Sequence, residues 1–328
     1  MNRTLVIGAR RRKLGIGEFV ARWFADAGAE VCAVVGTRME SAEEARQTLL
    51  QQYGIECRAY TQVEQALAAE DPQIVAICSP YACHREHLLA VASAGAHCLC
   101  EKPMWWNETH ADAVAEETTR LVDAFLDQNL HLELVTQWPQ TLPWFYQLFP
   151  EQQDRPVEQF CMQLSPSSKG ASTVLDSMPH VISMLQALVG CGDIHKARAR
   201  FLDAERGELR CEFEYHYGAE RVSAACLFKT CETPPRPAGY AINGEQADRV
   251  VQLPEYTMLL EGSLPGGRGK SVNLEDPLKL LVRDFLNTVI SGETGKNRQA
   301  LIESMTLQLP LIAAVHELER GSLDAGTS

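Results

Sequence analysis

The sequence has no paired-cysteine spacing, no long apolar run and no repetitive tract. Its 11 cysteines are scattered from Cys32 to Cys231 without a CxxC motif or any other metal-ligand spacing. An odd number of thiols, several of them in apolar segments, is typical of reduced core cysteines and disfavours a disulfide framework or a zinc site. The first apolar run, residues 5–9, is too short for a signal peptide or a membrane span. We therefore expect a cytoplasmic protein that binds no metal and does not enter a membrane.

Basic residues are also scarce. The chain has 30 lysines and arginines against 43 aspartates and glutamates, which gives a formal net charge of −13 and a pI of about 5.2. Such an acidic chain is not expected to bind nucleic acid as its main function. With 328 residues, 45% of them hydrophobic and 22% charged, the chain is long enough for about two globular domains of ordinary composition.

The first predicted strand, residues 4–8, is followed by a glycine-containing turn and an amphipathic helix. The second predicted strand, residues 31–35, comes after that helix. In this order of elements, backbone N–H groups and a helix N-terminus bind a dinucleotide pyrophosphate. The glycine spacing is irregular, because a regular GxGxxG motif would need glycine at Arg10 and Lys13. Alignment from the helix makes Gly17 the third glycine. The predicted cofactor ligands here are Gly8, Arg10, Gly15 and Gly17, and the alternative for the last two is an ordinary flexible turn.

The tip of the second strand lacks the acid that an NAD site usually carries. Thr37 and Arg38 follow the strand, and the first acidic residue is Glu40. An acid here binds the ribose 2′-hydroxyl of NAD, whereas a hydroxyl and a guanidinium suit the 2′-phosphate of NADP. We therefore predict NADP in preference to NAD, with NAD possible, and with Thr37 and Arg38 as ligands. The alternative is that Arg38 is a solvated loop arginine.

A second strand–helix–strand unit lies at residues 73–100, with its helix starting at His84. The motif Glu101-Lys102-Pro103 follows its second strand directly. Lys102 is therefore predicted to lie just past the carboxyl end of a parallel strand, where open α/β sheets bind their ligands. The alternative is a surface lysine that happens to follow a strand.

The order of motifs in this unit is strand, Ser79-Pro80, His84, helix, Gly95-Ala96-His97, strand and Glu101-Lys102-Pro103. This order resembles the Gfo/Idh/MocA oxidoreductases, the family of glucose–fructose oxidoreductase and inositol dehydrogenase. The resemblance implies an α/β protein with an N-terminal dinucleotide-binding Rossmann domain, residues 1–138. It further implies an α+β domain, residues 139–328, with an open, mostly antiparallel sheet that binds substrate and mediates oligomerisation. The cofactor-binding residues that it implies are Ser79, Pro80, His84, Glu101 and Lys102.

The second half of the chain alternates apolar and polar residues in the manner of half-buried strands, most clearly in residues 207–217. About six strands are expected there, mostly antiparallel, with a hairpin turn at Asn243-Gly244. Two helices, residues 276–291 and 297–320, are expected to close the chain. The sequence does not predict enough helices to cover both faces of such a sheet. We therefore predict that another copy of the chain covers one face, in a homo-oligomer that is either a dimer or a tetramer.

Aromatic residues suggest a dimer interface and a pocket wall, but the sequence does not decide whether either is formed. Phe213, Tyr215 or Phe228 on an exposed sheet face would suit a dimer. Four tryptophans are expected near the boundary between the domains, where they can form the wall of a pocket or pack between the domains. These tryptophans are Trp105, Trp106, Trp138 and Trp144.

Asp176 and His180 are four residues apart and share one face of a predicted helix. The segment resembles the family's Asp-x-x-x-His element, which implies that both side chains approach the substrate hydroxyl. An imidazole titrates near neutral pH and can accept the proton that hydride transfer leaves behind, while Lys102 can polarise the carbonyl. The alternative for His180 is a satisfied core histidine. Met178 stands where the family often has glycine, and with Pro179 it can reshape the pocket or shift the helix start.

Taken together, these residues predict an NAD(P)-dependent oxidoreductase with Lys102, Asp176 and His180 as the catalytic residues. Its small-molecule substrate is predicted to be a sugar-, polyol- or cyclitol-like alcohol or ketone. Two alternatives remain. Met178 and the tryptophans would suit an imine or conjugated-ring reductase of the same family, and loss of catalysis would leave a regulatory protein that senses NADP.

Overall fold

The computed structural model describes residues 2–10, 15–107, 113–253, 255–263, 269–295 and 297–324. The described chain forms two compact units. The first contains the residues up to Thr136 together with Leu278–Ile302, and the second contains Gln137–Pro277 and the residues from Glu303 onward. The sequence had placed everything after residue 138 in the second domain. Helix α8 returns to the first unit because its apolar face, which includes Val282 and Phe285, is buried in the core of that unit.

The first unit is built on a six-stranded sheet in the order β3-β2-β1-β4-β5-β6. Every strand pair in it is parallel. The strands are β1 Arg3–Ile7, β2 Glu30–Val35, β3 Arg58–Tyr60, β4 Ile74–Ile77, β5 His97–Cys100 and β6 Leu132–Leu134. The central strands are short runs of buried apolar residues, as expected of parallel strands covered on both faces. The strand order reverses between β1 and β4, which is where a Rossmann sheet binds its ligand.

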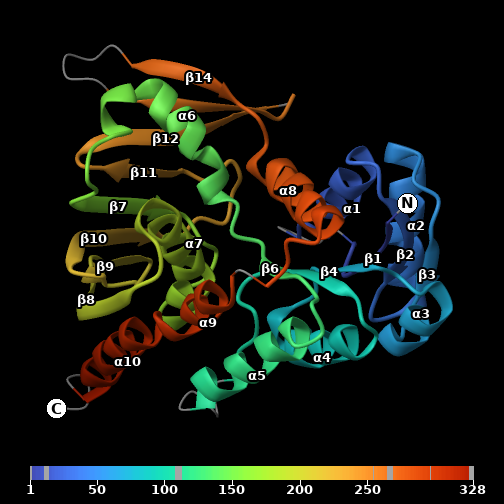
Figure 1. Cartoon of the computed structure of the whole chain (residues 1–328). Coiled ribbons are helices and arrows are strands. Elements are labelled where there is room, and N and C mark those ends of the chain that lie inside the picture. The colour runs from blue at the N-terminus through green and yellow to red at the C-terminus, as the bar shows by residue number, and fades with distance from the viewer. Residues whose placement is uncertain are drawn as a thin grey trace. The chain divides into compact units, whose positions relative to one another are not determined.

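Helices connect these parallel strands, as Figure 1 shows. They are α1 Gly17–Asp26, α2 Met39–Tyr53, α3 Val63–Glu70, α4 His84–Ser93 and α5 Val114–Leu126. Helix α8, Pro277–Ser291, follows β14 and packs on this unit without connecting its strands. Ser41 lies in the first turn of α2, which begins at Met39. The Ser41 hydroxyl donates to the Arg38 carbonyl oxygen at 2.7 Å and accepts from the Arg38 N–H at 3.2 Å.

The second unit contains an eight-stranded sheet in the order β14-β13-β12-β11-β7-β10-β9-β8. Only β7 and β10 pair in parallel, so the predicted fold class, a Rossmann domain followed by an α+β domain with a mostly antiparallel sheet, is confirmed. The strands are β7 Gln159–Leu164, β8 Asp193–Phe201, β9 Glu208–Tyr217, β10 Glu220–Lys229, β11 Ala238–Ile242, β12 Glu245–Gln252, β13 Thr257–Gly262 and β14 Lys270–Leu274.

Two of these strands, β13 and β14, were missed in the sequence. In β13 three consecutive apolar residues, Met258–Leu260, hide the alternation that its burial shows, and β14 is a short, polar edge strand. The hairpin turn between β11 and β12 is confirmed. Asn243 and Gly244 have φ values of 51° and 88°, the left-handed conformation that a type I′ turn requires at both central positions.

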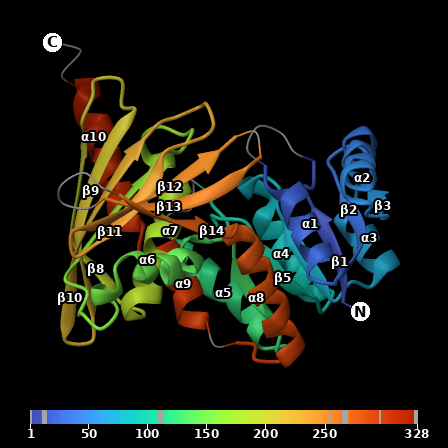
Figure 2. The ribbon, with the colours of Figure 1, turned by 90° about the horizontal axis from the view of Figure 1, so that it is seen from above.

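Helices cover one face of the second sheet. They are α6 Leu142–Leu148, α7 Ala171–Val189 and α10 Leu309–Asp324, and α6 and α7 lie over the strands in Figures 1 and 2. Phe213, Tyr215 and Phe228 point to this covered side and are at most 4% exposed, so none of them marks the open face. The expected closing helix 297–320 is divided into α9, Arg298–Thr306, and α10. Pro310 explains the break, because a proline lacks the N–H of a continuous helix and clashes with the preceding turn.

Candidate active site

Two glycines allow close approaches at the carboxyl edge of the first sheet. Gly8 has a φ of 85°, and a Cβ atom there would lie 2.6 Å from the carbonyl oxygen of Cys78 at the end of β4. A Cβ atom on Gly17 would lie 2.4 Å from the Gly8 oxygen. Both residues must therefore be glycine for α1 to begin against the end of β1, which is the geometry that a pyrophosphate-binding turn needs. Gly15 lies two residues before α1.

The loop after β2 contains a further close approach that the sequence analysis passed over. A Cβ atom on Gly36 would lie 2.9 Å from the backbone nitrogen of Ala42 in α2. The signal was present, since a glycine directly after a buried strand often marks a close backbone contact. Thr37 and Arg38 follow and are exposed at this edge, so both can reach a ligand.

Arg10 also contacts the element that follows β2. Its guanidinium forms an ion pair with Glu44 of α2, and its Nε atom is buried without a hydrogen-bond partner. The other members of the basic run, residues 11–13, lie outside the described residues. Arg10 is therefore held near the start of α2, but part of its charge is already balanced by Glu44.

His84 joins two loops of the site. Its Nδ1 and Nε2 atoms lie 2.9 Å from the Pro103 oxygen and 2.6 Å from the Ser79 oxygen. The ring is 1% exposed, and this burial lowers the pKa of His84, which favours the neutral imidazole. The sequence predicted a cofactor ligand, but a ring enclosed in this way is better placed to hold the turn after β4 against the loop after β5. Pro80 begins the short helix η1, Tyr81–Cys83, that leads to His84.

Lys102 is presented at the same edge by a loop with buried anchors. The Glu101 N–H donates to the Ile77 oxygen at 2.8 Å and so extends the pairing of β5 with β4. After Lys102 the chain turns inward, and Trp105 is 3% exposed with its Nε1 donating to the Thr118 hydroxyl at 3.0 Å. Trp105 is thus a packing residue, while the partly exposed Lys102 lies at the sheet edge.

Asp176 and His180 belong to the second unit, on α7. They are one helical turn apart on the same face; Asp176 is partly exposed and His180 is 9% exposed. The Ser168 hydroxyl lies 3.5 Å from Asp176 Oδ2. The structure therefore brings this predicted pair together. Lys102 stands in the other unit, so its approach to the pair remains a prediction.

The departure at Met178 does not affect the surface of α7. Met178 is 0% exposed, and the helix begins at Ala171, so neither Met178 nor Pro179 shifts its start. Trp138 is 3% exposed and packs edge-to-face against Tyr240, with ring centroids 6.1 Å apart. Met178 and the tryptophans were the features that suited an imine-reductase pocket. Met178 and Trp138 are buried inside the second unit, so these two residues no longer support that alternative.

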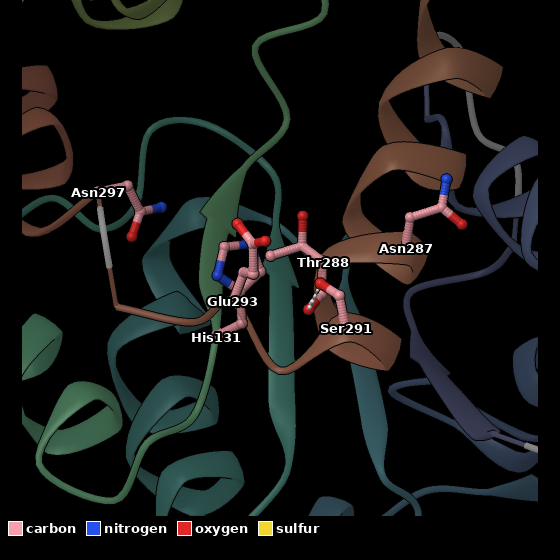
Figure 3. Close-up of a pocket in the computed structure, with 6 residues that line it drawn as sticks. All are labelled: His131, Asn287, Thr288, Ser291, Glu293 and Asn297. Carbon is pink, nitrogen blue, oxygen red and sulfur yellow. Dashed lines mark hydrogen bonds between the residues drawn. The ribbon is translucent and has the colours of Figure 1, made fainter.

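A polar pocket of about 490 Å³ lies elsewhere in the first unit (Figure 3). Its lining residues are His131, Asn287, Thr288, Ser291, Glu293 and Asn297. His131 directly precedes β6, so the pocket is at the amino edge of the sheet, opposite the loops described above. None of the predicted site residues lines it.

Known proteins resemble this chain to different extents in its two units. Residues 3–125 match the Gfo/Idh/MocA family model, described as an oxidoreductase family with an NAD-binding Rossmann fold. The match covers the first unit as far as α5. The resemblance predicted from the Glu-Lys-Pro segment is confirmed. The chain is also similar to D-glucoside 3-dehydrogenase of Escherichia coli, with 36% identity over 74 residues, 23% of this chain and 20% of that protein. The match thus spans about a fifth of this curated relative.

Solved structures extend the likeness to both units. UDP-N-acetylglucosamine 3-dehydrogenase from Acidithiobacillus ferrooxidans is 21% identical, with 96% of this chain and 98% of that chain covered and a TM-score of 0.70. Levoglucosan dehydrogenase in complex with NADH and levoglucosan is 15% identical, with coverage of 96% and 97% and a TM-score of 0.69. The myo-inositol 2-dehydrogenase from Lactobacillus plantarum is 14% identical, with coverage of 96% and 97% and a TM-score of 0.70. At these identities the likeness establishes that the chain shares the fold of these proteins.

Proposed function

We propose that this protein is an NAD(P)-dependent dehydrogenase or reductase. Its substrate is a sugar-, polyol- or cyclitol-like alcohol or ketone. The observation that carries the proposal is the carboxyl edge of the first sheet, where the close-approach glycines, the loop after β2 and Lys102 occur on neighbouring elements. The similar proteins named above are dehydrogenases of such compounds.

The residues at this edge fit a dinucleotide. Gly8 and Gly17 leave space that a Cβ atom would fill, next to the N-terminus of α1, where a pyrophosphate binds. When bound, the nicotinamide supplies or accepts the hydride. In the proposed reaction His180 accepts the proton of the substrate hydroxyl, and Asp176 orients the imidazole. Lys102 stabilises the negative charge that develops on the carbonyl oxygen.

NADP is the proposed cofactor in preference to NAD. The exposed Thr37 and Arg38 occupy the position where an NAD site has an acid, and a guanidinium forms charge-assisted bonds with a 2′-phosphate. Arg10 contributes less than its charge suggests, because Glu44 already neutralises part of it.

A second copy of the chain is the proposed partner, and it covers the open face of the second sheet. One row of paired residues crosses all eight strands on that face: Arg200, Arg210, Leu227, Gln163, Gly239, Asp248, Glu261 and Ser271. Two arginines lie opposite each other at one end, and two acids at the other. Like charges opposite each other are unfavourable within one sheet. A copy related by a twofold axis parallel to the strands would place each arginine end over an acidic end.

The cytoplasm is the proposed compartment. All 11 cysteines, which lie within the described residues, are free thiols, as expected in a reducing compartment. None of the helices within the described ranges is long and apolar enough to cross a membrane.

The test is a turnover panel with the purified full-length protein. Neutral polyols, cyclitols, sugars and the corresponding ketones are supplied with each dinucleotide, and absorbance of the reduced nicotinamide is followed. Dinucleotide binding is measured in parallel by calorimetry. Turnover of at least one substrate in the panel supports the proposal, whereas tight dinucleotide binding without turnover of any substrate favours the regulatory alternative.

A further inference from the structure

Arg249 of the second unit lies over the ring of Trp138 and contacts the backbone of a second arginine, Arg236. The Arg249 guanidinium carbon lies 5.1 Å from the centroid of the Trp138 ring, and its Nη2 is 3.5 Å from the Arg236 carbonyl oxygen. Arg236 in turn donates from Nη1 to the Ser165 oxygen at 2.9 Å. Both arginine side chains are partly exposed, so a ligand can reach them.

Neither charge is balanced by a close carboxylate. Among the described residues neither Arg236 nor Arg249 forms an ion pair, and the buried Nε of Arg249 has no hydrogen-bond partner. Burial lowers the pKa of Arg249, and the nearby Arg236 lowers it further, while Tyr256 and Asp276 act in the opposite direction. A buried donor without a hydrogen-bond partner costs free energy, which an anion at this point would recover.

Other arginines of the protein, unlike Arg249, form ion pairs with carboxylates. Arg3 lies 2.6 Å from Glu70, and Arg298 makes two bonds, of 2.7 and 2.8 Å, to Asp123. Those arginines are saturated by acids of their own unit. Each guanidinium has five N–H donors, and Arg249 uses one of them in a long bond to a carbonyl oxygen.

Arg249 lies on the same side of the sheet as the predicted catalytic helix, and Arg236 is tied to the segment that leads to that helix. Arg249 is two residues from Ala247, which is 0% exposed on the helix-covered face, and alternate residues of a strand share a face. Trp138 begins the short helix η3, Trp138–Thr141, which packs against α7. The segment that starts at Ser165, the partner of Arg236, also brings Ser168 to Asp176.

We propose that Arg236 and Arg249 form a subsite for an anionic group of the substrate. The group is the carboxylate of a sugar acid or the phosphate of a sugar phosphate, either of which accepts paired bonds from the planar guanidinium fork. The stacking on Trp138 holds the Arg249 fork in place before the ligand arrives. This inference rests on the proposed function, because it assigns a substrate class to the same site.

The test compares anionic and neutral sugars on wild type and three variants. The probes are glucuronate, glucose 6-phosphate and neutral glucose, each supplied with the dinucleotide. Arg249→Met keeps apolar packing on Trp138 but removes the charge, Arg236→Met removes the neighbouring charge, and Arg320→Met removes an exposed arginine of α10 as the control. We expect wild type to bind at least one anionic probe more tightly than glucose. The first two variants should lose about 10- to 100-fold of that affinity with no change for glucose.

Binding is measured by calorimetry and, where turnover occurs, as kcat/KM. Arg249→Lys keeps the charge without the fork, and intermediate affinity is expected; it also replaces the methionine variant if that protein does not fold. Preference of wild type for glucose, or equal losses for charged and neutral probes, would overturn the subsite while leaving the oxidoreductase proposal intact. Selective binding of the anionic probes without turnover of any substrate would instead retain the subsite and reject the enzyme. The better of the two anionic probes identifies the carboxylate or the phosphate as the ligand.

Discussion

At the residue scale, His180 and Lys102 have the most direct tests. His180→Ala should reduce kcat by about a hundred- to ten-thousand-fold, because the proton acceptor is lost. Lys102→Ala should cause a comparable loss by removing a preorganised charge, and both variants should still bind the dinucleotide.

Asp176→Asn should reduce turnover less, and its effect should be non-additive with His180→Ala if Asp176 acts through the imidazole. Near wild-type kcat in all three single variants would contradict these assignments.

Arg38 should decide which dinucleotide is preferred. Arg38→Ala removes a charge-assisted bond to the 2′-phosphate, so NADP binding should weaken by about 1.5–3 kcal/mol while NAD binding is unchanged. Titration calorimetry with each dinucleotide measures both constants. Equal losses for NAD and NADP would show that Arg38 has no role in this choice.

His84 should make the stability of the protein sensitive to acid. Burial lowers the pKa of His84 from its ordinary value of 6.5, so over the pH range between the two values the unfolded chain binds more protons than the folded one. Stability therefore decreases as the pH falls below about 6.5. In thermal melts between about pH 7.5 and pH 5.5, His84→Gln should show a smaller decrease than wild type. A slope in His84→Gln equal to that of wild type would contradict the prediction.

At the scale of elements, the junction of β1 with α1 depends on Gly17. A methyl group there would lie 2.4 Å from the Gly8 oxygen, so Gly17→Ala must move the start of α1. We expect this variant to bind NAD and NADP about tenfold or more weakly, in equal proportion, because the pyrophosphate site is common to both. Gly28→Ala is a control for loss of stability alone. It lies just after α1 with a φ of 90°, which strains alanine, but has no atom within 4 Å of its Cβ position, so the variant should be less stable and still bind both dinucleotides. Unaltered binding in Gly17→Ala would argue against this junction as the site.

At the scale of the whole molecule, the charged row on the open sheet predicts a dimer or a larger assembly. Light scattering at micromolar concentration should give a mass above the 36.4 kDa of the single chain. Reversal of charge in Arg200→Glu with Arg210→Glu should weaken the assembly, since it places acids over acids. The further changes Asp248→Lys and Glu261→Lys should restore it. A monomeric wild type, or reversal variants with unchanged mass, would reject this surface.

Local patterns predicted the first unit well because each of its elements is short and contiguous. The strand predicted at residues 31–35 begins one residue earlier, at Glu30, and the helix predicted to start at His84 does so. The role of His84 was less accessible, because its two carbonyl partners belong to loops after different strands. The membership of α8 was also hidden. Nothing within residues 278–302 indicates that this helix returns to a core formed almost entirely by the first third of the chain.

The sequence by itself determined which edge of the first sheet can bind a dinucleotide. The order of apolar runs, glycines and the Glu-Lys-Pro segment fixes the carboxyl ends of parallel strands. It also determined that Asp176 and His180 share a helix face, because that follows from a spacing of four. Only the tertiary structure decided which face of the second sheet is open and that Arg249 lies over Trp138 next to the backbone of Arg236. The reason is physical: helical and strand periodicities are local, whereas strand pairing and side-chain packing join residues about a hundred positions apart and leave no signal in either segment alone.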